Sequence, residues 1–485
     1  MTDISGGTKR QQRKKRRFIL LYTVALLMAF SPSKAIGQIL PIFFVLGMIL
    51  YVQVRPNTHI VKYGIVVIGV TLFGILYQLI LPEFWWAGYL FSVVTFSSFL
   101  LLLYDFSTLV DRQLLYRIGV VTSVVITVES IYGILQFMGA AARGGIKPWT
   151  GDFVWGTLAP PLDTHYAGTS PIFVLLISTL VLVALAASPA RLTRLRLASF
   201  IIVLTAWMTA SLLHSVIYFT AAVVAALAML FLLKPRRRYS FAFAKRNKGN
   251  LWIFAALLIL VVAGGAVYGQ NYRAIQEVLT SALEISPEAP YLKMRVLYNT
   301  LFVIPQQVIS QPILGLGPGQ FSSRAALMLT GDYLTRASIP FLGTHTSTLT
   351  DQHIIPYLGR YTSSNHFPSS SWLTVYGETG IVGVMLVLFL LIRAIRRFTQ
   401  IRSVYFTRMN LAALTLLFYI TLMGIQTVYW EYTQGICFAI LSLKLLYDYL
   451  GAERAFLRRN IHTAAPDTEL RLEPGGENPL TTPAA

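Results

Sequence analysis

The sequence contains few charged residues and a single cysteine. Only 12% of its 485 residues are charged, whereas a soluble chain has about a quarter. The cysteine, Cys437, lies inside an apolar run and has no partner for an intrachain disulfide. No small-residue cleavage site clearly follows the first apolar run, so we interpret that run as a retained span rather than a signal peptide. These absences exclude a soluble globular domain and a disulfide-stabilised secreted domain.

The sequence is instead rich in long apolar runs. Hydrophobic residues make up 55% of the chain, and its mean hydropathy is +0.61. A helix that crosses a bilayer needs about 20 mostly apolar residues, so we predict an all-α polytopic membrane protein with about twelve transmembrane helices. The predicted spans are residues 18–31, 36–54, 60–81, 84–104, 115–138, 170–189, 196–213, 215–233, 251–269, 375–393, 409–428 and 431–450.

The basic residues predict the orientation of these spans. The net charge of +20 does not indicate nucleic-acid binding, because the basic residues lie in short segments between the apolar runs. With the N-terminus inside and the spans alternating, about 31 of the 40 basic residues fall on the inner side, as the positive-inside rule requires. We therefore predict that both termini are cytoplasmic.

The polar segments divide the chain into regions. We predict that residues 1–17 and 451–485 are disordered cytoplasmic ends, because such polar segments cannot bury a core. Residues 18–269 hold nine of the predicted spans, and residues 372–450 hold three.

Two segments predicted on the outer side are longer than a connection needs, and long ordered loops are usually functional. One is residues 139–169. The other, residues 270–371, is predicted to be a large extracytoplasmic loop that carries short amphipathic helices. Within it, the glycine- and proline-rich segment 311–321 predicts a tight turn and no helix.

Three stretches carry a resemblance to a known family. The first runs from Glu129 through Trp155-Gly-Thr-Leu-Ala-Pro-Pro to Ala167. The second joins Met294-Arg295 to Pro312-Ile-Leu-Gly-Leu-Gly-Pro-Gly-Gln-Phe. The third is Ser371-Trp-Leu-Thr-Val-Tyr-Gly-Glu-Thr-Gly-Ile-Val-Gly. In this order, and with the large loop, they resemble the O-antigen ligases and the related O-antigen and exopolysaccharide polymerases of bacterial envelopes.

The resemblance implies a GT-C-like fold and an inverting, metal-independent glycosyltransferase without a cofactor. Such an enzyme passes glycan from a polyprenyl (undecaprenyl) diphosphate carrier to an acceptor hydroxyl at the outer face of the bacterial inner membrane. The product belongs to lipopolysaccharide or exopolysaccharide biosynthesis. The implied partners are the lipid-linked oligosaccharide donor, a glycan or lipid-core acceptor, membrane lipids and other envelope polysaccharide-assembly proteins, and no nucleic acid.

Two chemical demands select the candidate residues. Arginine suits the leaving diphosphate, because its planar fork binds phosphate oxygens bidentately and stays charged. A histidine or carboxylate suits removal of the acceptor proton. We predict Arg295, His366, His165 and Glu378 as catalytic residues, with Arg295 as the diphosphate ligand and His366 as the first choice of base. The predicted substrate-binding residues are Arg143, Arg324, Arg336, Arg360, Glu129 and His214.

Other interpretations of these residues and of the whole chain stay open. Arg295 would alternatively reach lipid headgroups, Glu129 would pair within the bundle, and Glu378 would anchor the start of a span. The chain would alternatively be a transporter or flippase of lipid-linked glycans, although its spans carry few charges and no internal repeat is evident. A non-enzymatic scaffold would leave the arginines and histidines of the large loop unexplained.

Overall fold

The computed structural model describes residues 4–142, 284–357 and 370–463, with gaps at 32–33, 54–55, 82–83, 290–291, 324, 327–347, 401–406 and 427–428. Within these residues the regular structure is entirely helical. The four spans predicted between residues 170 and 269, and most of the loop at 139–169, lie outside them.

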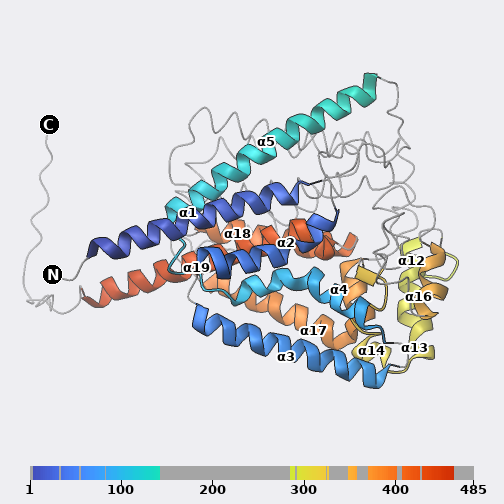
Figure 1. Ribbon diagram of the computed structural model, residues 1–485. Coiled ribbons are helices and arrows are strands. Elements are labelled where there is room, and N and C mark those ends of the chain that lie inside the picture. Colours follow the sequence, from blue (N-terminus) through green and yellow to red (C-terminus); the bar gives the residue numbers. More distant parts are fainter. Residues whose placement is uncertain are drawn as a thin grey trace, which may run out of the picture.

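The long helices form a bundle, and each covers one of the predicted spans (Figure 1). Helices α2 and α4 continue into a π-helical segment, η1, and a 3₁₀ segment, η2, respectively. The bounds are α1 (Ile4–Ala29), α2 (Lys34–Gly47), η1 (Met48–Val52), α3 (Pro56–Ile80), α4 (Trp86–Phe96), η2 (Ser97–Leu103), α5 (Arg112–Ala142), α17 (Ser371–Gln400), α18 (Thr407–Gln426), η6 (Tyr429–Glu431) and α19 (Thr433–Thr463).

Three described stretches are long and apolar enough to cross a membrane. They are Trp86–Leu103, Ser371–Thr399 and Thr433–Ala452, with mean hydropathies of 1.8, 2.2 and 1.4. The chain therefore has membrane-protein character, as its composition predicts.

Aromatic side chains fill the centre of the bundle. Phe18 of α1 contacts Phe44 and Phe106 edge-on, with ring centroids 6.2 and 6.0 Å apart. Tyr22, one turn further along α1, packs edge-on against Phe438 of α19 at 5.4 Å. Edge-to-face pairs of this kind add about 0.5–1.5 kcal/mol to the burial of each ring. They align α1, α2 and α19 side by side.

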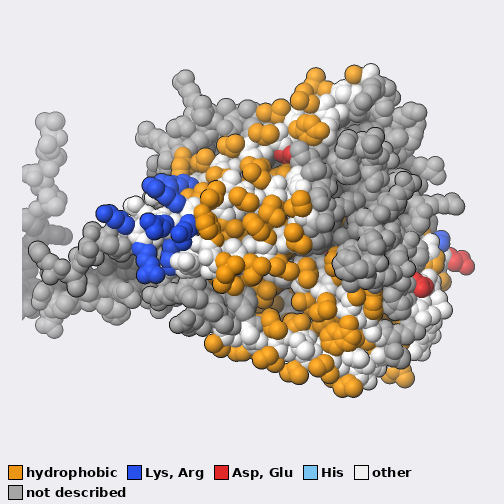
Figure 2. Space-filling model, in the orientation of Figure 1, with side chains coloured by type: hydrophobic (Ala, Val, Ile, Leu, Met, Phe, Trp, Pro, Cys, Tyr) orange, Lys and Arg blue, Asp and Glu red, His pale blue; other side chains and the backbone are white. Residues whose placement is uncertain are grey.

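The outer faces of several helices are apolar. On α3, Ile65 and Leu79 are 64% and 80% exposed, and on α17 Phe389 is 58% exposed. Figure 2 shows such side chains in a broad belt, while most of the Lys and Arg side chains visible in that view gather at one end. A belt of this kind suits contact with acyl chains, because water would oppose so large an apolar surface.

The ends of the chain differ from the prediction of disorder. Helix α1 begins at Ile4 and α19 continues to Thr463, so residues 4–17 and 451–463 are helical. Lys, Arg and Gln are good helix formers, and several of these side chains find partners. Lys15 pairs with Asp111 at 2.5 Å, and Lys14 donates to the Gln53 carbonyl at 2.7 Å. These contacts hold the basic segment as a helix against the bundle, although its charge alone would favour a disordered, hydrated chain.

Candidate functional site

Short helices cover the end of the bundle opposite the start of α1 and the end of α19 (Figure 1). They follow one another through residues 292–314 and 348–357, and a turn at residues 315–321, here called the glycine turn, joins them to the bundle. Their bounds are α12 (Leu292–Tyr298), η4 (Asn299–Val303), α13 (Ile304–Gln307), α14 (Gln311–Leu314), α16 (Thr348–His353) and η5 (Ile355–Tyr357). The prediction that segment 311–321 contains no helix is therefore wrong for its first four residues, where Pro312 occupies an early helical position that tolerates proline.

Helix α17 is broken near its start by Gly380. This residue has φ 62° and ψ −161°, a conformation that is open essentially to glycine alone. The break interrupts the regular backbone ladder, and two carbonyls of the preceding turn accept bonds from outside the helix. The Leu316 N–H donates to the Gly377 carbonyl at 2.8 Å, and the Gly317 N–H donates to the Glu378 carbonyl at 2.9 Å. The glycine turn therefore supplies the backbone donors at the break.

The glycine turn reaches α17 because it has no side chains at the points of contact. Gly315, Gly317 and Gly319 have φ values of 73°, 94° and 74°. A Cβ on Gly315 would collide with the backbone of Glu378, and one on Gly319 would collide with the backbone of Gly88 in α4. The tight turn predicted from the composition is confirmed for these residues.

A side chain of α3 and the backbone just before α4 hold the other side of the turn. The Tyr77 hydroxyl donates to the Leu314 carbonyl. The Gln320 amide pairs with the backbone of Trp85 in both directions, donating at 2.8 Å and accepting at 3.0 Å. Nothing in the sequence pattern separates Tyr77 from other span residues or Gln320 from other turn residues, so sequence reasoning missed both.

The carboxyl group of Glu378 is buried beneath the turn, with 3% of the residue exposed. The N–H of Phe321 donates to it at 3.4 Å, and the backbone N–H groups of Gly319 and Ser323 and the Ser323 hydroxyl are also directed at it. These donors satisfy the buried carboxyl oxygens, which would otherwise lack hydrogen-bond partners. The structure thus shows Glu378 in contact with the glycine turn, and its predicted catalytic role stays a prediction.

A small hydrophobic core unites the short helices with the start of α17. Thr350 of α16 also donates to the carbonyls of Gln320 and Phe321, at 3.1 and 3.3 Å. Segments that are up to about 80 residues apart in the chain therefore form one unit, which we call the capping unit. Its core residues are Val296, Ile304, Leu316, Phe321, Ile354 and Leu373.

Arg295 lies half-buried on α12 within this unit. Its Nε–H donates to the Ala289 carbonyl and its Nη2 donates to the Glu288 carbonyl at 3.2 Å. These bonds occupy the Nε/Nη2 edge of the guanidinium group and fix its plane. The opposite edge, formed by Nη1 and the second hydrogen of Nη2, makes no bond to the described part of the chain.

Lys293 precedes Arg295 by two residues and is buried, with 8% of the residue exposed. Burial lowers the pKa of its ammonium group to about 7, because a charged amine loses its hydration inside the unit. Burial also lowers the pKa of His353, whose Nε2 lies 3.3 Å from Oε1 of Gln307. We did not predict Lys293 as a site residue, because a lysine in an apolar helix normally extends to water.

Of the remaining predicted site residues, the structure describes Glu129 alone. Glu129 is buried on α5, with 5% of the residue exposed, and α5 packs against α1 instead of the capping unit. The structure therefore brings Arg295 and Glu378 into one unit and leaves Glu129 apart from them. The other predictions lie outside the described residues: His366, His165, Arg143, Arg324, Arg336, Arg360 and His214. Among the described residues, no group of three or more His, Cys, Asp or Glu is placed to bind a metal ion.

The fold and site define a helical protein with membrane-protein character, whose capping unit is fastened to the bundle by a glycine turn. No family model and no curated protein matches the sequence.

Proposed function

We propose that this protein is an envelope glycosyltransferase that moves glycan from a polyprenyl diphosphate carrier to an acceptor hydroxyl, as an O-antigen ligase or surface-polysaccharide polymerase. One observation carries the proposal. Two of the stretches that resemble this family, Pro312 to Phe321 and Ser371 to Gly383, are bonded to each other through Leu316 and Gly317. The arginine of the same resemblance, Arg295, lies on a helix of the same small core.

The proposed topology has about twelve spans in a bacterial inner membrane, both termini in the cytoplasm and the capping unit outside. It is supported by the separation of charge along the bundle (Figure 2). Helix α1 carries basic residues from Lys9 to Arg17, and α17 ends with Arg393, Arg396 and Arg397, at the end remote from the capping unit. Positive charge of this kind marks the cytoplasmic ends of spans.

In the proposed reaction, the acceptor oxygen attacks the anomeric carbon of the donor sugar. The bond between that carbon and the diphosphate oxygen breaks, and polyprenyl diphosphate leaves with its electrons. The Nη1/Nη2 edge of Arg295 binds the departing phosphate oxygens, which gain charge in the transition state. The acceptor proton passes to a base, for which His366 and His165 are the candidates. The bonds to Ala289 and Glu288 hold the guanidinium group of Arg295 in place, so it needs no reorientation as charge develops on the phosphate.

The test is transfer by the purified protein, supplied with a polyprenyl-diphosphate oligosaccharide with or without lipid-core acceptor. Product that requires the core defines a ligase, and chain growth from donor alone defines a polymerase. We expect Arg295→Ala to lose about 10²–10³ in turnover, the usual cost of removing one charge-stabilising donor. Arg295→Lys recovers only part of this, because an ammonium group cannot bind bidentately.

Arg393→Ala is the matched control, because Arg393 is an exposed arginine at the opposite end of the bundle. It should retain full turnover. Donor that stays intact with every acceptor would overturn the proposal. Movement of labelled donor across a vesicle membrane, in place of transfer, would then establish the flippase alternative.

A further inference from the structure

One face of α1 carries a row of basic side chains that continues an exposed apolar stripe. Lys9, Arg13 and Arg16 are exposed and lie four and three residues apart, so they share one side of the helix. Leu20 and Leu27 are 53% and 59% exposed and follow Arg16 by one and three helical turns, so they extend the row along the same side. The helix therefore presents a single outer stripe that changes from apolar to basic near Arg16.

The opposite face of α1 faces the bundle core. Phe18, Tyr22 and Ala25 are buried there. Basic residues on its flanks have partners: Lys15 pairs with Asp111, and Arg17 donates to the Tyr51 carbonyl at 3.1 Å. Lys9, Arg13 and Arg16 differ from these, because they make no bond to the described part of the chain. Within the described part of the chain, the row therefore does not hold the fold.

The row also destabilises the isolated helix. Helix α1 contains no acidic residue, and like charges at spacings of three and four repel each other. An anionic partner outside the protein would relieve this repulsion. From Lys9 to Arg16 the row extends about 10 Å along the axis, since each helical residue rises about 1.5 Å. This is close to the thickness of the headgroup layer on one side of a bilayer, about 5–8 Å.

We propose that Lys9, Arg13 and Arg16 form a binding surface for anionic phospholipid headgroups of the leaflet that α1 enters. The exposed apolar stripe lies against acyl chains, and the basic row then meets the phosphates of the same lipids. Three observations select this partner: the continuity of the two stripes, the absence of acidic residues in α1, and the lack of bonds from the row to the described chain. The inference rests on the proposed topology, in which α1 enters the membrane, and not on the glycosyltransferase activity.

The test compares lipid binding by the full-length protein in nanodiscs that contain phosphatidylcholine and spin-labelled phosphatidylglycerol. The motionally restricted fraction of the label gives the association constant relative to labelled phosphatidylcholine. The triple variant K9Q/R13Q/R16Q should lower this preference several-fold, because each basic residue near an anionic surface contributes about a fivefold preference before screening. Raised salt should reduce the wild-type preference towards that of the variant. Glutamine keeps the helix, since it is a good helix former.

The matched control is K62Q/R393Q/R396Q, which removes three exposed basic residues from α3 and α17 without touching the row. It should keep most of the wild-type preference. Inorganic phosphate should not displace the labelled lipid, because the free ion has no acyl chain to contact the apolar stripe. Equal preference in the wild type and the α1 triple variant, or an equal loss in the control, would overturn the proposal.

Discussion

At the residue scale, backbone conformation decides which side chains the capping unit tolerates. Gly315 has φ 73° and ψ −168°, and a Cβ there would collide with the Glu378 and Thr379 backbone. We expect Gly315→Ala to destabilise the protein by about 1–3 kcal/mol from backbone strain alone, and by more once the collision is included. Thermal unfolding of the purified protein, followed by circular dichroism, measures the effect.

Gly64 provides the control for this substitution. It lies in α3 with φ outside the left-handed region, and no atom lies within 4 Å of a Cβ added there. Gly64→Ala should therefore stabilise α3 by about 0.5–1 kcal/mol, because alanine is the better helix former. A Gly315→Ala variant as stable as the wild type would contradict the described contact between the glycine turn and α17.

Lys293 links stability to pH. Burial lowers its pKa from 10.5 to about 7, so between these values the unfolded chain binds a proton that the folded chain does not. Stability therefore rises with pH across this window, and the full penalty of the buried charge is present below pH 7. Lys293→Met removes the group, so its melting temperature relative to wild type should be higher at pH 6 than at pH 9. If the variant and the wild type differ in melting temperature by the same amount at both pH values, the amine is not desolvated.

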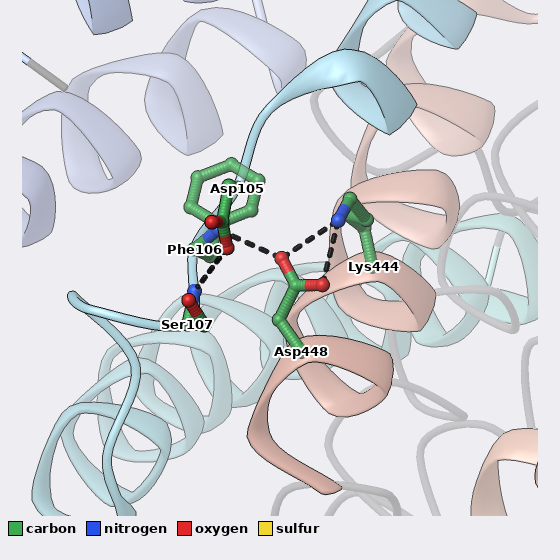
Figure 3. A network of polar contacts seen from close by, with 5 residues as sticks. All are labelled: Asp105, Phe106, Ser107, Lys444 and Asp448. Carbon is green, nitrogen blue, oxygen red and sulfur yellow. Dashed lines mark hydrogen bonds and ion pairs between the residues drawn. The ribbon is translucent and has the colours of Figure 1, made fainter. Parts of the chain in front are cut away.

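At the element scale, a buried ion pair positions α19 against the segment that follows η2 (Figure 3). Lys444 contacts both oxygens of the Asp448 carboxylate, at 2.6 and 2.7 Å. The same carboxylate accepts from the Phe106 N–H at 2.7 Å. The side chains of Lys444 and Asp448 are 12% and 7% exposed, so the pair is largely removed from solvent. Lys444 and Asp448 lie on the same helix, so the bond from the Phe106 N–H is the one that joins α19 to the segment between η2 and α5.

Removing one partner of this pair should cost more than removing both charges. Lys444→Met leaves the Asp448 carboxylate buried with the Phe106 N–H, and we expect a loss of about 3–5 kcal/mol. Lys444→Met combined with Asp448→Asn removes both charges and keeps an acceptor for the Phe106 N–H, so it should be less destabilising than Lys444→Met alone. The coupling energy follows from a double-mutant cycle of unfolding measurements. Additive effects would mean that the pair contributes no coupling.

At the scale of the whole molecule, the apolar runs predicted the long helices well, because a helix that enters lipid must be apolar over its own length. The break at Gly380 could not be predicted in this way. It depends on Leu316 and Gly317, which lie about 60 residues away in the chain and meet it only in the folded protein. The burial of Lys293 was missed for the same reason, since it depends on the packing of the capping unit. The helix over residues 4–17 was missed because its charge was interpreted as a sign of disorder.

The proposed orientation predicts that the two ends of the bundle lie on opposite sides of the membrane. Gln12 is exposed on α1, at the basic end of the bundle. Gln352 is exposed on α16, in the capping unit. Cys437 is the one cysteine of the sequence, so Cys437→Ala gives a cysteine-free background. In that background, Gln352→Cys should react with a membrane-impermeant maleimide on intact cells, and Gln12→Cys should react only after the membrane is opened.

Both variants should react to the same extent in detergent, which controls for local accessibility. Labelling of Gln12→Cys alone on intact cells would invert the proposed orientation and place the capping unit in the cytoplasm. Arg295 would then lie on the side where a polyprenyl-linked glycan is made instead of where it is transferred, and the proposed reaction would fail with the topology. Labelling of Gln352→Cys alone would put the capping unit and Arg295 on the outer face, where the proposed enzyme must bind the donor diphosphate.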